Sequence, residues 1–263
     1  MEISLLGSGS QGNAVLVRAE EGAFLIDAGL SARQIGERMA SLGLSPGELA
    51  GLVVTHEHID HVRSAGVLAR KWGLPVWTNR ATREAGAALL GPLRRWREVA
   101  VGVPFEIAGV RLEPFSTPHD AADPFGLLLR DGEGYRVALA TDMGFVTRLV
   151  RERVRGVQGL ILEFNHELDL LLAGPYPWPV KQRIRGKLGH LSNEDAAGLL
   201  AEVAGDDLEW VVCAHISQEN NEERIVLERA AEALNGRGAD PWAARQDRPT
   251  PRFGPGGRLE EAP

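Results

Sequence analysis

This chain has very few of the features that mark several common classes of protein. Cys213 is the only cysteine in 263 residues, which excludes an internal disulfide framework and is compatible with the cytoplasm, where we expect the protein. Cys213 lies in an apolar run, so we expect a buried strand thiol rather than a metal ligand. No stretch approaches the roughly 20 apolar residues of a membrane-spanning helix. The first residues lack a basic segment followed by an apolar run, so we expect no signal peptide and no membrane partner.

Basic residues are outnumbered by acidic ones, 29 to 36. The formal net charge is −7, which by itself does not indicate a nucleic-acid-binding protein. Binding depends on the local surface, however, and one dense basic run lies at residues 181–187. Its four cationic side chains are the candidates for contacts with backbone phosphates: Lys181, Arg183, Arg185 and Lys187.

The length and a hydrophobic content of 44% allow one large α/β domain or two small ones, with a substantial core. Two similar β-rich halves flanked by helices would form a four-layer αββα sandwich, although the pattern alone indicates only an α/β fold with much antiparallel strand. The middle third is rich in short strands. Elsewhere we expect strands near 2–6, 14–18, 23–27, 51–54, 74–77, 158–163 and 209–214, and helices near 31–42, 62–72, 80–90, 166–173, 193–204 and 222–235.

Residues 236–263 differ in composition from the rest of the chain. They are rich in proline, glycine and arginine and show neither helical nor strand periodicity. We therefore expect a flexible or surface-lying tail that follows a single domain formed by residues 1–235.

The most informative segment is His56-Glu57-His58-Ile59-Asp60-His61, which follows an apolar strand pattern. Alternate side chains of an extended segment point the same way, so His56 and His58 can reach one metal ion. Asp60 and His61, where the chain turns into a helix, can serve a second ion. Imidazole and carboxylate together suit zinc, manganese or iron. The alternative is a solvated polar loop, which the density of ligands disfavours.

Three further candidates lie at the ends of predicted strands, where sites gather in α/β sheets. His119 and His215 are candidate metal ligands, although a lone histidine in a loop is usually structural. Asp142 could bridge two ions, although an aspartate at this place can also cap a helix. Together with the histidine-rich segment, these residues supply enough ligands for two metal sites that share Asp142. One would contain His56, His58 and His119, and the other Asp60, His61 and His215.

Four polar residues remain near the predicted strand ends. Asp27 could orient the histidine-rich segment, or it could simply occupy a turn. His190 could protonate a leaving group or hold a phosphate, and Glu163 could pair with it. Capping and packing roles explain these two residues equally well. His166 is a further candidate for contact with substrate.

Together these residues resemble the metallo-β-lactamase superfamily of binuclear hydrolases. The resemblance extends from residue 1 to about 235 and implies the αββα sandwich. Finer resemblance, to the YycJ/WalJ branch of that superfamily, is carried by the segments 7–13, 27–31, 118–121, 174–179 and 189–196. That branch implies a 5′→3′ DNA exonuclease, with DNA as its substrate and mismatch-repair or replication proteins as partners.

Two details refine this resemblance. Segment 189–196 is also similar to the histidine-bearing loop of the RNase Z and PhnP phosphodiesterases, which implies that Glu163 and His190 assist the leaving group. The sequence after His119 departs from the pattern of glyoxalases and lactamases, which argues against a small thioester or lactam substrate.

The resemblance and the ligands predict phosphodiester hydrolysis at two divalent metal ions. A hydroxide that bridges the ions would attack phosphorus, with Asp60 and Asp142 as catalytic carboxylates, and His190 would protonate the departing oxygen. The alternative function is a small-molecule phosphodiesterase at the same site, and a non-catalytic metal-stabilised scaffold is the least favoured. Tyr176 and Trp178 could stack on bases, although we favour a rigid packed turn for their proline-rich segment.

Overall fold

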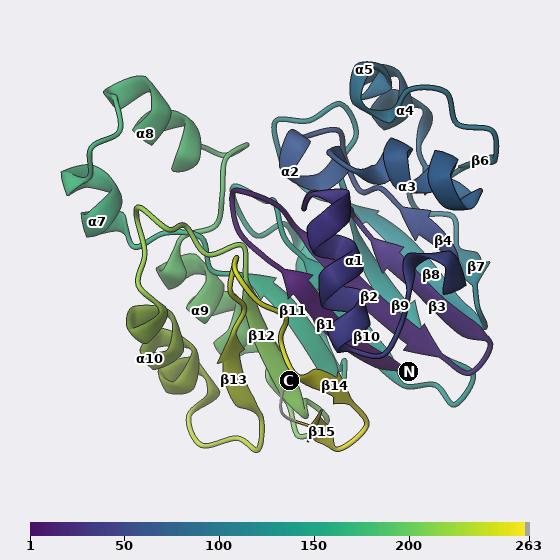
Figure 1. Cartoon of the computed structure of the whole chain (residues 1–263). Helices are drawn as coiled ribbons and strands as arrows, with labels where there is room; N and C mark the ends of the chain where they lie inside the picture. Colours follow the sequence, from purple (N-terminus) through teal and green to yellow (C-terminus); the bar gives the residue numbers. More distant parts are fainter. Residues whose placement is uncertain (261–263) are drawn as a thin grey trace.

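The computed structural model describes residues 1–260 and contains two β-sheets that pack face to face (Figure 1). The first sheet contains β1 (Glu2–Gly7), β2 (Ala14–Ala19), β3 (Gly22–Ile26), β4 (Leu49–Val53), β5 (Val76–Thr78), β6 (Trp96–Glu98), β14 (Arg252–Gly254) and β15 (Gly257–Glu260). The second contains β7 (Phe105–Ile107), β8 (Val110–Ser116), β9 (Phe125–Arg130), β10 (Arg136–Ala140), β11 (Gly159–Glu163), β12 (Trp210–Ala214) and β13 (Asp240–Ala243). Their orders are β15-β14-β1-β2-β3-β4-β5-β6 and β13-β12-β11-β10-β9-β8-β7.

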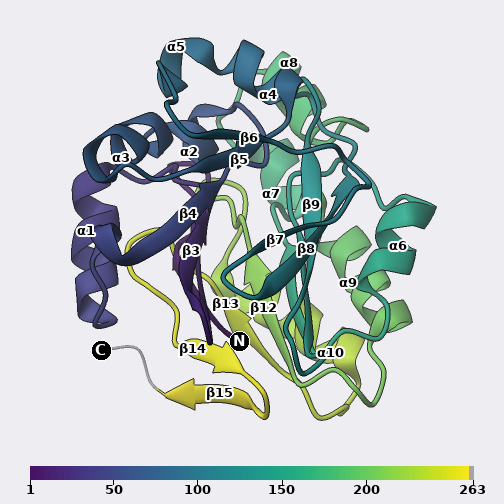
Figure 2. The same ribbon diagram turned by 90° about the vertical axis from the view of Figure 1, so that its right-hand side faces the viewer.

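Helices cover the outer face of each sheet (Figure 2). Those of residues 1–260 are α1 (Ala32–Ser41), α2 (Ile59–Val62), α3 (Ala65–Trp72), α4 (Arg80–Ala85), α5 (Ala87–Leu90), α6 (Arg148–Val154), α7 (Leu168–Ala173), α8 (Trp178–Ile184), α9 (Asn193–Val203), α10 (Glu223–Leu234) and a short 3₁₀ helix (Pro46–Glu48). α1 and α3 pack on the first sheet, and α6, α9 and α10 pack on the second. These layers are the αββα sandwich that the sequence predicts.

Three apolar clusters fill the spaces between the four layers. The cluster between the sheets includes Phe24 of β3 and Trp210 of β12. Ile35 of α1 belongs to the outer cluster of the first sheet, and Leu199 of α9 belongs to that of the second. Cys213 is buried in β12, as predicted, and burial raises the pKa of its thiol. Burying each large apolar side chain contributes about 1.5–3 kcal/mol, so packing of the layers fixes where the strands end.

Strand direction brings the ends of several strands to one edge of the sandwich. β3 and β4 are parallel, and so are β10, β11 and β12. Asp27 directly follows β3 and Thr55 comes two residues after β4, while Asp142 and His215 follow β10 and β12. The carboxyl ends of neighbouring parallel strands are where sites form in α/β folds.

The prediction of a flexible or surface-lying tail is wrong for the described part of 236–263. β13 pairs in parallel with β12, and β14 pairs with β1 through Phe253 and Ile3. Phe253 is only 2% exposed and packs in the core between the sheets. Pro241 is tolerated because β13 is an edge strand, where a missing N–H group need not break the ladder. Residues 261–263 of the predicted tail lie outside the described residues.

The predicted helices are present, with differences in detail. The helix expected near 62–72 is divided into α2 and α3, and the one near 80–90 into α4 and α5. α6 and α8 were not predicted. Ser192 is the N-cap of α9, where its side chain accepts the N–H of Asp195. Among residues 1–260, no helix combines the length and the apolar character needed to cross a membrane.

Candidate metal centre

The predicted ligands converge where the strands of both sheets end. They form two groups whose donor atoms lie within 4.8 Å of one another, His56, His58 and His119 in the first group and Asp60, His61 and His215 in the second. Asp142 lies between them, with carboxylate oxygens 3.5 Å from Nε2 of His61 and 3.3 Å from Nε2 of His215. The same carboxylate is 3.8 Å from Nε2 of His119. The fold thus gathers both predicted sets around one shared carboxylate.

Hydrogen bonds behind His56 determine which of its nitrogens faces the cluster. A carboxylate can only accept, so the hydroxyl of Thr55 donates to Oδ2 of Asp27 at 2.9 Å. The same hydroxyl oxygen lies 3.0 Å from Nδ1 of His56 and therefore accepts its N–H. In a neutral imidazole the other nitrogen then carries a lone pair. That nitrogen, Nε2 of His56, is buried in the cluster without a hydrogen-bond partner.

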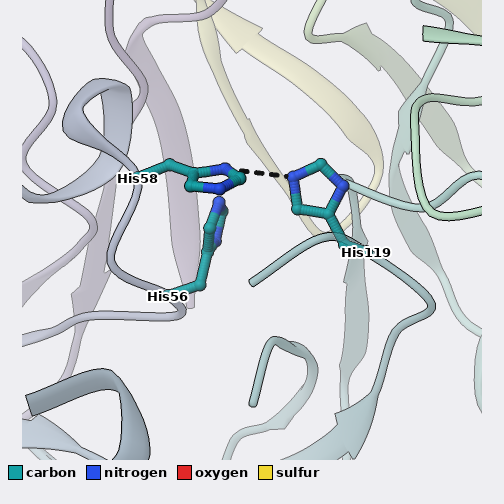
Figure 3. Close-up of side chains that lie close together, drawn as sticks. All are labelled: His56, His58 and His119. Atoms are coloured by element: carbon teal, nitrogen blue, oxygen red, sulfur yellow. Dashed lines mark hydrogen bonds between the residues drawn. The ribbon is translucent and has the colours of Figure 1, made fainter. Parts of the chain in front are cut away.

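His58 and His119 face each other in the first group (Figure 3). Nδ1 of His119 lies 2.9 Å from the carbonyl oxygen of Gly189 and donates to it. Nε2 of His58 lies 3.2 Å from the carbonyl oxygen of Asp120 and also donates. The remaining nitrogens, Nε2 of His119 and Nδ1 of His58, are 3.2 Å apart. In neutral imidazoles both carry lone pairs, so this contact requires a positive charge, either a proton or a metal ion.

Asp27 also contacts the second group, which is one of the two roles that the sequence allows for it. Its Oδ2 lies 2.8 Å from Nδ1 of His61, and its Oδ1 accepts the N–H of Thr55 at 2.8 Å. Nε2 of His61 then faces Asp60, whose Oδ2 is 3.5 Å away and also lies 3.3 Å from Nε2 of His215. One buried carboxylate thus orients histidines of both groups.

Burial and neighbouring carboxylates act in opposite directions on these imidazoles. Burial lowers the pKa of His56 and of His119 below the ordinary histidine value, so both are neutral at pH 7. Burial also opposes protonation of His61 and His215, but the Asp142 carboxylate and its neighbours outweigh it and raise both pKa values, that of His215 to about 9. Burial likewise opposes ionisation of Asp142, yet His215 and His61 hold its pKa well below the usual range. In the metal-free protein, protonated imidazoles therefore pair with ionised carboxylates in the second group.

The donor atoms fit divalent metal ions. Two buried atoms of the cluster, Nε2 of His56 and Oδ2 of Asp142, have no hydrogen-bond partner, whereas buried polar atoms almost always have one. Imidazole nitrogen and carboxylate oxygen are ligands for zinc, manganese and iron. A cation in each group would satisfy the two unpartnered atoms and relieve the contact between His58 and His119.

Asn13 joins its loop to the loop of the second group through Asp60. The sequence does not single out this residue. The N–H of Asn13 donates to the carbonyl of Asp60 at 2.7 Å, and its Nδ2 lies 3.3 Å from Oδ2 of the same residue. Gly29 permits this approach, because a Cβ at its position would lie 1.6 Å from the Asp60 carbonyl oxygen. Segment 7–13 carries part of the family resemblance, but the sequence does not predict this contact.

Three residues of the centre adopt left-handed backbone conformations. φ is 61° at Asp27, 59° at Asp142 and 53° at His215. Such a conformation costs a residue other than glycine about 1–2 kcal/mol. All three follow a strand by one or two residues. Packing of the sheets thus maintains backbone strain at this centre. Strained backbone conformations are common at functional sites.

His190 lies beside the second group and pairs with Glu163, as one of our alternatives predicts. Its Nδ1 is 2.7 Å from Oε1 of Glu163. Oε2 of this fully buried carboxylate accepts the N–H groups of Met143 and Leu191 at 3.0 and 3.3 Å. Donor atoms of Asp142, Glu163, His190 and His215 also lie within 4.8 Å of one another. His190 can therefore act as a proton donor or as a further metal ligand.

The four cationic residues of 181–187 have different surroundings. Lys181 is 9% exposed, and its Nζ donates to the carbonyl of Leu172 at 2.6 Å. Its predicted contact with phosphate is therefore wrong, because the amine joins α8 to α7. Arg183 pairs with Asp120 at 2.5 Å, at the rim of the first metal-binding group. The other two, Arg185 and Lys187, are exposed and have no carboxylate partner within residues 1–260.

Three other residues lie just before α7 or at the start of α8. His166 is only 1% exposed, and burial lowers its pKa to about 4, so its predicted contact with substrate is wrong. Trp178 is 54% exposed at the start of α8, so the packed turn that we favoured is wrong for this ring. Asn165, which the sequence analysis missed, donates from Nδ2 to the carbonyl of His215 at 2.8 Å. It stood beside His166 in the sequence without a motif of its own.

Known proteins share this sequence pattern and fold. Residues 7–215 match the family model of the metallo-β-lactamase superfamily. Exodeoxyribonuclease YycJ of Bacillus anthracis is 35% identical over 240 residues, which are 90% of each chain. Exodeoxyribonuclease WalJ of Streptococcus pneumoniae is 33% identical over 246 residues, 90% of this chain and 91% of WalJ.

A solved structure of low sequence identity shows the same architecture. The metallo-β-lactamase fold protein YhfI of Bacillus subtilis superposes with a TM-score of 0.72 at 15% identity, over 94% of this chain and 98% of YhfI. Its likeness concerns the fold alone, whereas the family match and the curated relatives concern the sequence. The chain therefore belongs to the metallo-β-lactamase superfamily and, within it, to the family of the exodeoxyribonucleases YycJ and WalJ.

Proposed function

We propose that this protein is a metal-dependent phosphodiester hydrolase that degrades DNA as a 5′→3′ exonuclease. The observation that carries the proposal is the position of Asp142, 3.5 Å from Nε2 of His61 and 3.3 Å from Nε2 of His215, between two groups of metal-binding side chains. Relatives that are named exodeoxyribonucleases, at 33% and 35% identity, support DNA as the substrate.

The proposed cofactors are two divalent ions, zinc, manganese or iron. The first group, His56, His58 and His119, would hold one ion, and the second group, Asp60, His61 and His215, would hold the other. Asp142 would contact both. When bound, such ions supply Lewis-acid stabilisation of a phosphoryl group and lower the pKa of a water molecule enough for it to react at neutral pH.

His190 is the proposed proton donor to the departing oxygen. Since Glu163 accepts the Nδ1 hydrogen at 2.7 Å, Nε2 is the nitrogen that remains to hold the transferred proton. The buried carboxylate also stabilises the positive imidazolium that donates. In this proposal Asp142 binds the metal ions and His190 protonates the leaving group.

Contacts with the substrate backbone are proposed for three of the basic residues after α7. Arg183 lies beside the first metal-binding group through Asp120, and Arg185 and Lys187 offer exposed charges nearby in the sequence. Their charges would hold phosphates next to the scissile bond.

We assign the activity to the cytoplasm, because the only cysteine is buried and unpaired, and to mismatch repair on the family resemblance.

The test is a time course of Mn²⁺-dependent cleavage of 5′-phosphorylated, internally labelled DNA. Wild type is compared with Asp142→Asn, which keeps the side-chain size, and with Asp206→Asn, an exposed and equally isosteric control. We expect release of nucleotides from the 5′ end by the wild type and the control, and a loss on the order of 10³-fold for Asp142→Asn.

Metal content is measured on every sample by mass spectrometry. Full activity of Asp142→Asn with both ions bound would contradict the shared-carboxylate site. No cleavage of DNA by wild type with its ions bound would contradict the nuclease assignment, and hydrolysis of a small phosphodiester alone would then favour the small-molecule enzyme.

A further inference from the structure

A cleft that shares no residue with the two metal-binding groups lies between α10, β13 and the β14–β15 hairpin, elements that neighbour one another in Figure 1. Its volume is about 460 Å³, which is within the usual range for ligand sites. Apolar side chains such as Leu227 and Pro251 line part of it. The remaining wall carries Arg245, Arg248 and Arg258.

These three arginines differ in their partners. Arg245 is paired with Glu223 at 2.7 Å. Arg248 and Arg258 are exposed, and neither has a carboxylate partner among the side chains of residues 1–259. Segment 237–258 contains five arginines and two aspartates, in a chain whose net charge is −7. Two uncompensated guanidinium groups in one cleft of an acidic protein favour an anionic ligand, and their planar geometry suits phosphate.

Trp242 adds a planar wall beside this charge. The guanidinium carbon of Arg258 lies 5.3 Å from the centre of the indole ring. Phe253 packs against the same ring edge-on, with 6.4 Å between ring centres, so the indole has a supported position. An aromatic ring next to arginines is the combination that binds a base by stacking and its phosphate by charge.

A second hollow continues this cleft toward the metal centre. Its volume is about 340 Å³, and it shares Glu223 and Arg245 with the first. At its other end it reaches Ser8 and Ile216. Ser8 accepts the backbone N–H of His215 at 2.8 Å, and Ile216 is the next residue in the chain. The two hollows adjoin at the ion pair of Arg245 with Glu223, and the second one extends to Ser8, which contacts the backbone of His215. We call the two hollows together the groove.

We propose that this groove binds the substrate strand at nucleotides distant from the scissile phosphate. A base lies against Trp242, and phosphates lie at Arg248 and Arg258. The inference rests on the proposed nuclease function and adds a strand-binding surface to the one after α7. It explains why an acidic chain carries arginines without a carboxylate partner on β15 and in the loop between β13 and β14.

The test measures binding of 3′-labelled single-stranded DNA of 5 and 25 nucleotides by fluorescence anisotropy, in Asp142→Asn protein to prevent cleavage. Arg248→Ala/Arg258→Ala is compared with Arg94→Ala/Arg97→Ala, which removes the same charge from exposed arginines in and before β6, at the opposite edge of the first sheet. All four arginines are exposed, so folding is expected to be unchanged, and melting curves verify this.

We expect the cleft variant to bind the 25-mer roughly tenfold more weakly. The slope of log K against log salt should fall by about 1.4, since each phosphate contact on a single strand contributes about 0.7. Affinity for the 5-mer should stay unchanged. Hydrolysis of a small chromogenic diester should also stay unchanged when the two arginine substitutions are made in the otherwise wild-type protein. Trp242→Ala should also weaken binding of the 25-mer roughly tenfold, without a change in the salt slope.

Equal affinity of the cleft variant and its parent for the 25-mer would overturn the inference. So would weaker binding of a free deoxynucleoside monophosphate with unchanged binding of the 25-mer, because the cleft would then serve a small ligand. These measurements do not depend on cleavage. Failure of wild type to degrade DNA therefore counts against the proposed function, whereas unchanged strand binding with normal cleavage counts against this groove alone.

Discussion

Glu163 fixes His190: Oε1 of the buried carboxylate lies 2.7 Å from Nδ1 of the imidazole. Its Oε2 accepts two backbone N–H groups, at 3.0 and 3.3 Å. A carboxylate held on both oxygens has one orientation, and it imposes one tautomer on the ring that donates to it. Nε2 of His190 is therefore the nitrogen left for the reaction.

We expect His190→Asn to lower kcat for DNA by about 10²–10⁴-fold, because the leaving oxygen would depart without a proton donor. Hydrolysis of a 4-nitrophenyl diester should fall far less, since that leaving group needs no proton. Steady-state kinetics on both substrates measure the difference. Loss of one bound ion in this variant would instead identify His190 as a metal ligand.

Asp27→Asn should weaken metal binding about 10–100-fold, because the variant removes the charge that orients His61 and, through Thr55, His56. Competition with a chelator of known affinity measures the change. Asp206→Asn, an exposed control, should bind metal as the wild type does. Wild-type affinity in Asp27→Asn would show that the strands alone orient these imidazoles.

Metal binding should release protons at pH 7. The pKa of His61 is raised well above the usual value and that of His215 to about 9, so both imidazoles are protonated in the metal-free protein and must lose a proton to bind an ion. Affinity should therefore rise with pH until about pH 9. Calorimetric titration with Zn²⁺ in buffers of different ionisation enthalpy should give about two protons released. A value near zero would contradict the charge state inferred for the second group.

Lys181→Met should change the stability of the protein, whereas Lys187→Met should change its KM for long DNA. Lys181→Met removes the donor to the Leu172 carbonyl and should lower the free energy of unfolding by about 1–2 kcal/mol, with KM for long DNA unchanged. Lys187→Met alters an exposed side chain and should leave stability unchanged while raising KM for long DNA. Urea unfolding and steady-state kinetics measure both. A raised KM for Lys181→Met alone would reverse the two assignments.

The sequence identifies the candidate metal ligands that the fold brings together, because their identity and place are local features. His56, His58, Asp60 and His61 lie within six positions, and the other candidates end predicted strands. The sequence does not predict which nitrogen each imidazole presents. That depends on Thr55, on the carbonyl of Gly189 and on Asp120, which only the fold brings to the cluster.

The errors have related physical causes. β13 to β15 are short and rich in proline and glycine, so their stability comes from pairing with β12 and β1, which are distant in sequence. Pro255-Gly256 between two short polar and apolar runs is a turn signal that could have indicated the hairpin. Lys181 was misassigned because a run of charges does not reveal which face of a short helix packs against a neighbour.

The left-handed backbone at Asp27, Asp142 and His215 has a consequence for the life of the protein in the cell. In the metal-free chain this strain is added to two buried polar atoms without a hydrogen-bond partner, Nε2 of His56 and Oδ2 of Asp142, both in residues that follow core strands. An ion that binds only the folded state offsets these costs by mass action. Metal supply would then affect more than turnover: with the ion scarce, a larger fraction of the chains would be unfolded and open to degradation.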